Sequence, residues 1–148
     1  MLCKSRNNGL KKEKLLYRKW DCLIAYNHVT ECGQSGIYTG GNGGLSKSNR
    51  IIGNLVEKCW NRGIDQGVNA TQSVSNDVIG QNIVGNICRN NRENNIWLAG
   101  TTRCNASANT SIYDSEYATL FAGYYGGHTG IALTNGAVGT VPQGNRIS

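Results

Sequence analysis

Apolar residues recur along the chain in short runs separated by single Asn or Gly residues, and the runs themselves repeat. Residues 24–40 align without a gap with residues 51–67 at an offset of 27, and the second unit aligns with residues 83–99 at an offset of 32. This period is far longer than a helical turn, and one such unit is too small to bury its own apolar side chains. We therefore predict stacked coils of short β-strands.

Five columns of equivalent residues run through this alignment, and most of their members are apolar. In a parallel stack with coils about 4.8 Å apart, equivalent residues lie above one another, so the apolar and Cys columns should fill a narrow interior. The Asn column should occupy a corner in left-handed backbone conformations and form a ladder of side-chain hydrogen bonds. The columns are Ile24, Ile51 and Ile83; Asn27, Asn54 and Asn86; Val29, Val56 and Cys88; Cys32, Cys59 and Asn91; and Ile37, Ile64 and Ile96.

The pattern N-x-I-x-x-N-x-V-x-x-C-x-x-x-G-I-D, from Asn49 to Asp65, resembles the repeat of pectate-lyase-like right-handed parallel β-helices. Within that group the Asn- and Gly-rich coils look most like those of bacteriophage tailspikes and capsule depolymerases. The resemblance covers residues 24–99 well and residues 126–148 weakly. It implies an all-β fold, a right-handed single-stranded parallel β-helix, or solenoid.

The repeat divides the chain into four parts. We expect a basic N-terminal segment or cap at 1–21, three coils at 22–100, an inserted loop at 101–127, and a further coil with the start of the next at 128–148. Because the closing "GNRIS" looks like the beginning of another unit, we expect the chain to be a fragment of a longer β-helix.

Composition narrows the set of partners and cofactors. The net charge is +6, but seven of the 15 basic residues lie in residues 1–19, which leaves a neutral body. We therefore expect neither a nucleic-acid partner nor a membrane partner. Several of the six Cys fall in the interior columns, and neither CxxC nor HExxH spacing occurs. They are expected to be buried thiols, with no metal and no cofactor.

The residue after each Gly-Ile pair provides a candidate ligand surface. Tyr38, Asp65, Trp97 and Ala132 follow the buried Ile column, so they should face solvent on adjacent coils. Aromatic rings stack on the C–H faces of sugars, and a carboxylate can serve as an acid or a base. Tyr38 and Trp97 are therefore candidate substrate-binding residues and Asp65 a candidate catalytic residue, unless they are ordinary exposed strand residues.

The expected insertion supplies two more acidic residues. Glycoside hydrolysis usually needs two carboxylates, and Asp114 or Glu116 could form the pair with Asp65. Elimination on uronic acids would instead need cations beside the sugar carboxylate. Arg89 is a candidate substrate-binding residue of this kind, as are Arg62, Arg92 and Arg103, although Arg89 could simply pair with Glu57 across strands.

The resemblance implies part of a tailspike-like protein that binds a bacterial surface polysaccharide, a capsule or an O-antigen. It leaves open whether the polysaccharide is also cleaved, by a hydrolase or by a lyase. It further implies a homotrimer in the virion tail, extracellular after assembly in a bacterial cytoplasm. The alternatives are a non-catalytic β-helix adhesin or structural fibre, and a cellular polysaccharide lyase or epimerase.

Overall fold

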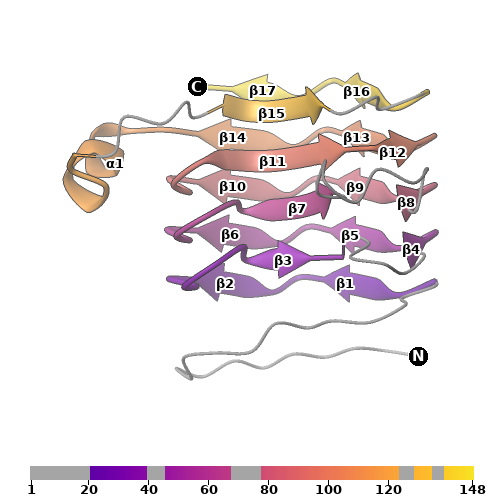
Figure 1. Ribbon diagram of the computed structural model, residues 1–148, viewed down its shortest axis with the longest axis horizontal. Coiled ribbons are helices and arrows are strands. Elements are labelled where there is room, and N and C mark those ends of the chain that lie inside the picture. Colours follow the sequence, from indigo (N-terminus) through magenta and orange to yellow (C-terminus); the bar gives the residue numbers. More distant parts are fainter. Residues whose placement is uncertain (1–20, 40–45, 68–77, 124–128, 135–138) are drawn as a thin grey trace.

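The computed structural model describes residues 21–39, 46–67, 78–123, 129–134 and 139–148. In these ranges the chain winds into a stack of short parallel strands, with successive coils lying one above another and one short helix at the side of the stack (Figure 1). The expected N-terminal cap lies outside the described residues, apart from Asp21.

The strands form four parallel sheets, each of which takes strands from successive coils. Sheet 1 consists of β1 (Leu23–Ala25), β5 (Arg50–Ile52), β9 (Asn82–Val84), β13 (Asn105–Ser107) and β16 (Val141–Gln143). Sheet 2 consists of β2 (His28–Thr30), β6 (Leu55–Glu57), β10 (Ile87–Arg89), β14 (Thr110–Ile112) and β17 (Arg146–Ile147). Sheet 3 consists of β3 (Ile37–Tyr38), β7 (Ile64–Gly67), β11 (Asn94–Ala99) and β15 (Thr129–Thr134). Sheet 4 consists of β4 (Ser46–Lys47), β8 (Val78–Ile79) and β12 (Thr101–Thr102). The helix is α1 (Ser115–Leu120).

The strand register confirms the apolar columns. Ile51 lies between Ile24 and Ile83 in sheet 1, and Val56 and Ile64 occupy the equivalent central places in sheets 2 and 3. These three side chains are fully buried and belong to one core cluster. The interior is thus a narrow column of stacked aliphatic and Cys side chains, as the repeat predicts.

The Asn ladder is also confirmed, and it is longer than the sequence alignment suggests. Asn54 donates its backbone N–H and its amide N–H to the Asn86 Oδ1, at 3.0 and 2.9 Å. The same pair of bonds joins Asn27 to Asn54, Asn86 to Asn109, and Asn109 to Asn145. Each rung satisfies a buried donor of the coil below it, which a purely apolar corner could not do.

The predicted left-handed conformation of the Asn column is wrong. The positive φ values belong to the preceding residues, Tyr26, Gly53, Gly85, Ala108 and Gly144. The preceding residue makes the bend between sheets 1 and 2, so the Asn that follows is left to bond along the stack. Asn145 is the next member of this Asn ladder after Asn109. The closing "GNRIS" therefore lies at the corner between sheets 1 and 2 rather than at the start of a unit.

Residues 101–112 differ from the expected insertion. They form β12, β13 and β14, which pair with β8, β9 and β10 in sheets 4, 1 and 2. The repeat is hard to recognise here because Ala106 and Ser111 replace the larger core residues, although Asn109 continues the ladder. In the described residues, the departure from the coil begins after β14 and carries α1. Beyond it, Ile131 stacks on Ile96 as the alignment predicts.

The cysteines follow the core prediction. The five in the described ranges are thiols rather than disulfides, and Cys59 and Cys88 are fully buried. Within the same ranges, no group of three His, Cys, Asp or Glu residues is placed to hold a metal ion. A search of the described residues likewise finds no helix long and apolar enough to cross a membrane.

Candidate functional site

The predicted ligand column lies on the outer side of sheet 3. Tyr38, Asp65, Trp97 and Ala132 are in register on successive strands. The expectation that this column is open to solvent is wrong for its central members, because Asp65 is 4% exposed and Trp97 is 9% exposed. Both are covered by side chains from the turns that precede the strands, which strand alternation alone cannot predict.

Arg62, in the turn before β7, connects this column. Its Nη1 lies 3.2 Å from the Asp65 Oδ2, and its Nη2 lies 3.2 Å from the Glu93 Oε2. The guanidinium carbon is 3.7 Å from the centroid of the Trp97 ring. The guanidinium therefore stacks on the indole while two carboxylates hold its edge. We call this set, Arg62, Asp65, Glu93 and Trp97, the sheet-3 cluster.

Two polar atoms of the sheet-3 cluster are buried without a hydrogen-bond partner among the described residues, the Asp65 Oδ1 and the Arg62 Nε. The other oxygen of Asp65 accepts a hydrogen bond of 2.9 Å from the Ser35 hydroxyl. Burial raises the pKa of the Asp65 carboxyl above its ordinary value, although Arg62 opposes the shift. A carboxyl that retains its proton to higher pH is suited to act as a general acid.

Tyr38 lies beside this carboxyl in the register of sheet 3. Burial, followed by the negative charge of Asp65, raises the pKa of Tyr38 to about 12. Its hydroxyl therefore keeps its proton at any physiological pH and is available as a hydrogen-bond donor.

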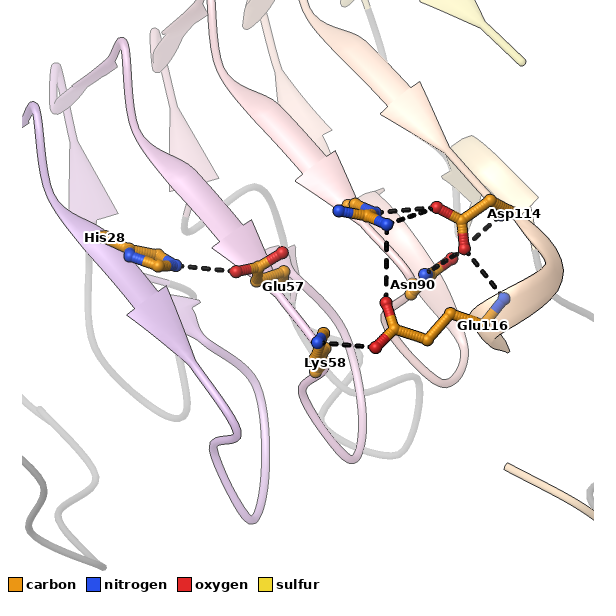
Figure 2. A network of polar contacts seen from close by, with 7 residues as sticks. His28, Glu57, Lys58, Asn90, Asp114 and Glu116 are labelled. Atoms are coloured by element: carbon orange, nitrogen blue, oxygen red, sulfur yellow. Dashed lines mark hydrogen bonds and ion pairs between the residues drawn. The ribbon is translucent and has the colours of Figure 1, made fainter. Parts of the chain in front are cut away.

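A second cluster ties α1 to sheet 2. The Arg89 Nε and Nη2 lie 2.8 and 2.7 Å from the Asp114 Oδ2, and the same Nη2 lies 3.5 Å from the Glu116 Oε2. The Lys58 Nζ lies 2.7 Å from the Glu116 Oε1. Asn90 donates to the Asp114 Oδ1 at 2.7 Å. We call these five residues the α1 clasp, and Figure 2 shows Asp114 and Glu116 turned toward the coil.

Asp114 has a local structural role in this clasp. It is the N-cap of α1, because its Oδ1 accepts the backbone N–H of Glu116 at 3.0 Å. Hydrogen bonds from Asn90 and then Arg89 lower the pKa of the Asp114 carboxyl. Arg89 is thus held by acids of the α1 segment, while Glu57 pairs with His28 at 2.7 Å, in place of the alternative pair of Arg89 and Glu57 (Figure 2).

The tyrosines of the α1 segment pack against the coil. The Tyr113 hydroxyl donates to the Glu93 carbonyl at 3.0 Å, and the Tyr117 hydroxyl donates to the Arg92 carbonyl at 2.6 Å. Phe121 is buried and meets the Trp60 ring edge-on, with 5.9 Å between the centroids. These contacts seat α1 over the turns that follow β6 and β10. Tyr124 and Tyr125 lie outside the described residues.

The predicted site residues therefore fall into two groups. Tyr38, Asp65 and Trp97 come together on sheet 3, whereas Arg89, Asp114 and Glu116 come together in the α1 clasp. Asp65 pairs with Arg62 in the first group, while Asp114 and Glu116 pair with Arg89 in the second. The predicted dyad of Asp65 with Asp114 or Glu116 therefore stays a prediction. Sequence reasoning missed Glu93. Glu93 lies in the turn before β11 at the position equivalent to Asn61, one residue before the position equivalent to Arg62.

Comparisons with known proteins identify the kind of β-helix that this chain resembles. No family model matches the chain. The chain is 41% identical over 127 residues to the tail spike protein of Salmonella phage epsilon15, a match that covers 85% of this chain and 12% of that protein. It resembles the crystal structure of the Dettilon tailspike protein (gp208) with a TM-score of 0.73 and 48% identity, over 95% of this chain and 27% of that one. The chain thus spans a minor part of each relative, and it is a tailspike-like right-handed parallel β-helix.

Proposed function

We propose that this tailspike-like β-helix forms part of the surface with which a phage tailspike binds a bacterial surface polysaccharide, a capsule or an O-antigen. The likeness to two tailspikes supports this proposal. The protein would then belong to the virion tail, outside the cell after assembly in a bacterial cytoplasm, and would act as a homotrimer.

The observation that carries the proposal is the alignment of Tyr38, Asp65 and Trp97 on successive coils of sheet 3. Neighbouring coils are about 4.8 Å apart, so the three residues span about 10 Å, a length comparable with two sugar rings. The indole offers a flat apolar face, and the carboxyl and phenol offer hydrogen bonds. A polysaccharide lying along the stack would pass over all three residues and would contact Asp65 and Trp97 once the side chains that cover them move aside.

For cleavage we propose Asp65 as the general acid, because its burial favours the protonated carboxyl. The second carboxylate is taken from Asp114, Glu116 or Glu93. Glu93 is the one that shares a guanidinium with Asp65, and this shared contact keeps the two carboxyl oxygens within about 9 Å of each other, a limit that admits both the retaining and the inverting separation.

The ion pairs favour hydrolysis over elimination. A lyase that acts on uronic acids needs a cation free to neutralise the sugar carboxylate. Arg62 already contacts Asp65 and Glu93. Arg89 already contacts Asp114 and Glu116 in the same way. Each guanidinium thus already contacts two protein carboxyl groups, so neither is left free to neutralise a sugar carboxylate.

The test is binding and depolymerisation of purified O-antigen polysaccharide from smooth Salmonella, the host genus of one relative. Trp97→Ala should abolish most of the binding, and Asp65→Asn should abolish chain shortening while binding remains. Glu93→Gln, Glu116→Gln and Asp114→Asn identify the second carboxylate in the same assay. Arg50→Ala, an exposed change on sheet 1, is the matched control. Binding without shortened product in the parent protein would instead favour a non-catalytic adhesin.

A further inference from the structure

In the sheet-3 cluster the Arg62 guanidinium covers the face of Trp97 on which a sugar could stack. We propose that Arg62 is a side-chain gate over a carbohydrate subsite on Trp97, and that a sugar ring opens the gate by replacing the guanidinium on the indole. This inference rests on the proposed function, since it names where and how the polysaccharide binds.

The platform beneath the gate is built by Trp97 and Gly67. A Cβ placed on Gly67 would lie 1.8 Å from the Trp97 ring, so the indole lies directly against the backbone of the neighbouring strand β7. Only glycine leaves room for the ring to lie on the sheet in this way. The indole is therefore supported from beneath by the coil, as a stacking surface needs to be.

The guanidinium occupies the place that a sugar would use. Its carbon is 3.7 Å from the ring centroid, which is ordinary stacking distance. With Arg62 in that position Trp97 is only 9% exposed. An aromatic residue that is to bind a saccharide must present an open face, so the closed arrangement requires Arg62 to move before a sugar can stack.

Two ion pairs hold the Arg62 side chain over Trp97, and the more exposed of them can be replaced by contacts with water. Arg62 meets Asp65 and Glu93 through its two terminal nitrogens, each at 3.2 Å. The Glu93 side chain is 33% exposed, and the Arg62 side chain 20%, so this contact is partly hydrated. An ion pair of this kind contributes little net stability, because water and salt compete for both partners. The contact with Asp65 is more buried, because the Asp65 side chain is only 6% exposed, so opening the gate leaves that carboxyl for the entering sugar to satisfy.

The ligand would satisfy what the closed gate leaves unsatisfied. The Asp65 Oδ1 and the Arg62 Nε are both buried without a partner among the described residues, one of them on the carboxyl and the other on the guanidinium. A sugar hydroxyl can donate a hydrogen bond to the Asp65 Oδ1, while the Arg62 Nε reaches water when the side chain swings outward. Such a ligand would replace a cation–π contact by sugar stacking and would satisfy a buried polar atom in the same step.

A gate lowers the apparent affinity by the fraction of molecules in which it is closed. Removing Arg62 should therefore strengthen binding, whereas a direct ligand contact should weaken when it is removed. The contact that closes the gate is of the order of a cation–π pair, so we expect Arg62→Ala to raise the affinity for the polysaccharide by up to about tenfold.

The experiment has two readouts on one protein, in which Trp20→Phe and Trp60→Phe leave Trp97 as the only tryptophan. Quenching of its fluorescence by acrylamide measures access to the indole without any carbohydrate. We expect weak quenching in the parent, stronger quenching in Arg62→Ala, and no change in the control Arg50→Ala. Titration with purified smooth Salmonella O-antigen polysaccharide then measures affinity, with circular dichroism to confirm folding.

The possible results separate the two proposals. Stronger quenching together with tighter binding in Arg62→Ala supports the gate. Unchanged quenching, or binding that becomes weaker while the parent still binds, overturns the gate and leaves the proposed function in place. If neither the parent nor any variant binds the polysaccharide, the proposed function fails and the gate fails with it.

Discussion

Gly85 and Ala108 stand at the same corner of two successive coils, and both have left-handed backbone conformations, with φ of 64° and 53°. The left-handed region is unfavourable for a residue with a Cβ by about 1–2 kcal/mol. We therefore expect Ala108→Gly to increase the free energy of unfolding by up to about 1 kcal/mol, after allowance for the greater entropy of glycine in the unfolded chain. Urea denaturation followed by circular dichroism measures this change.

The reverse change, Gly85→Ala, is the matched control. A Cβ on Gly85 meets no atom within 4 Å, so the substitution adds backbone strain without a steric clash. It should lower the free energy of unfolding by about 1 kcal/mol. If both substitutions changed the free energy of unfolding in the same direction, the left-handed conformation of the corner would not be the cause.

The Asn ladder should be the most sensitive polar feature of the coil. Asn86 is fully buried, and its amide donates to the Ile51 carbonyl at 2.9 Å as well as to the next rung. Asn86→Ala would leave the backbone N–H of Asn54 without its acceptor, and we expect a loss of about 2–4 kcal/mol in the free energy of unfolding. Thermal and urea denaturation measure it.

Two comparisons give this prediction its control. Asn82→Ala, at an exposed position of sheet 1, should change stability by less than about 0.5 kcal/mol. Asn86→Asp keeps the shape but places a carboxylate oxygen against the Ile51 carbonyl, so it should also destabilise at neutral pH and recover in part on acidification. A wild-type stability for Asn86→Asp at pH 7 would contradict the ladder as a source of stability.

The coil could be predicted from the sequence because its interior repeats strictly. Ile51, Val56 and Ile64 stack on equivalents in both neighbouring coils, and a column of this kind leaves an obvious record in an alignment. The coil of residues 101–112 left a weaker record, since Ala106 and Ser111 fill the same column with smaller side chains. Packing in a narrow interior depends on summed volume, so the identity of one member can change while the fold stays the same.

The candidate site was only half predictable for a related reason. Strand alternation correctly placed Tyr38, Asp65 and Trp97 in one column. Arg62 and Glu93, which cover that column, lie in turns before the strands, where side-chain direction follows from the local path of the backbone and has no period. The burial of Asp65 is a consequence of those turns, and no pattern of residues on the strand itself reports it.

The α1 clasp should persist to low pH. The folded-state pKa of Asp114 lies below its ordinary value of 3.8, so the ionised carboxylate favours the clasp at all pH values above that range. The contribution is lost as the pH falls through the lowered pKa. We expect hydrogen exchange of the α1 amides, followed by mass spectrometry, to stay slow down to about pH 4 and to accelerate below it, once the intrinsic pH dependence is corrected.

Substitutions at Asp114 separate its two roles. Asp114→Asn retains an oxygen for the N-cap but loses the charge that meets Arg89, so α1 should be partly released, whereas Asp114→Ala loses both and should release it fully. The clasp is partly exposed, so added salt should also speed exchange in the parent protein. Exchange in Asp114→Asn as slow as in the parent protein would show that the charge does not hold α1.

Cys32 should be the most reactive described thiol of the core column. Interaction with the Cys59 thiol lowers the pKa of Cys32, although burial opposes the shift. The same contact, together with burial, raises the pKa of Cys59, so Cys32 is the member of the pair that ionises first. The thiolate is the reactive form, so alkylation of Cys32 by iodoacetamide should rise with pH around a midpoint below the ordinary value of 9.0, while the buried Cys59 stays unmodified. Peptide mapping by mass spectrometry distinguishes the sites. Cys59→Ala removes the neighbouring thiol and should move the Cys32 midpoint back up toward the ordinary value of 9.0. An unchanged midpoint in that variant would show that Cys59 does not stabilise the thiolate.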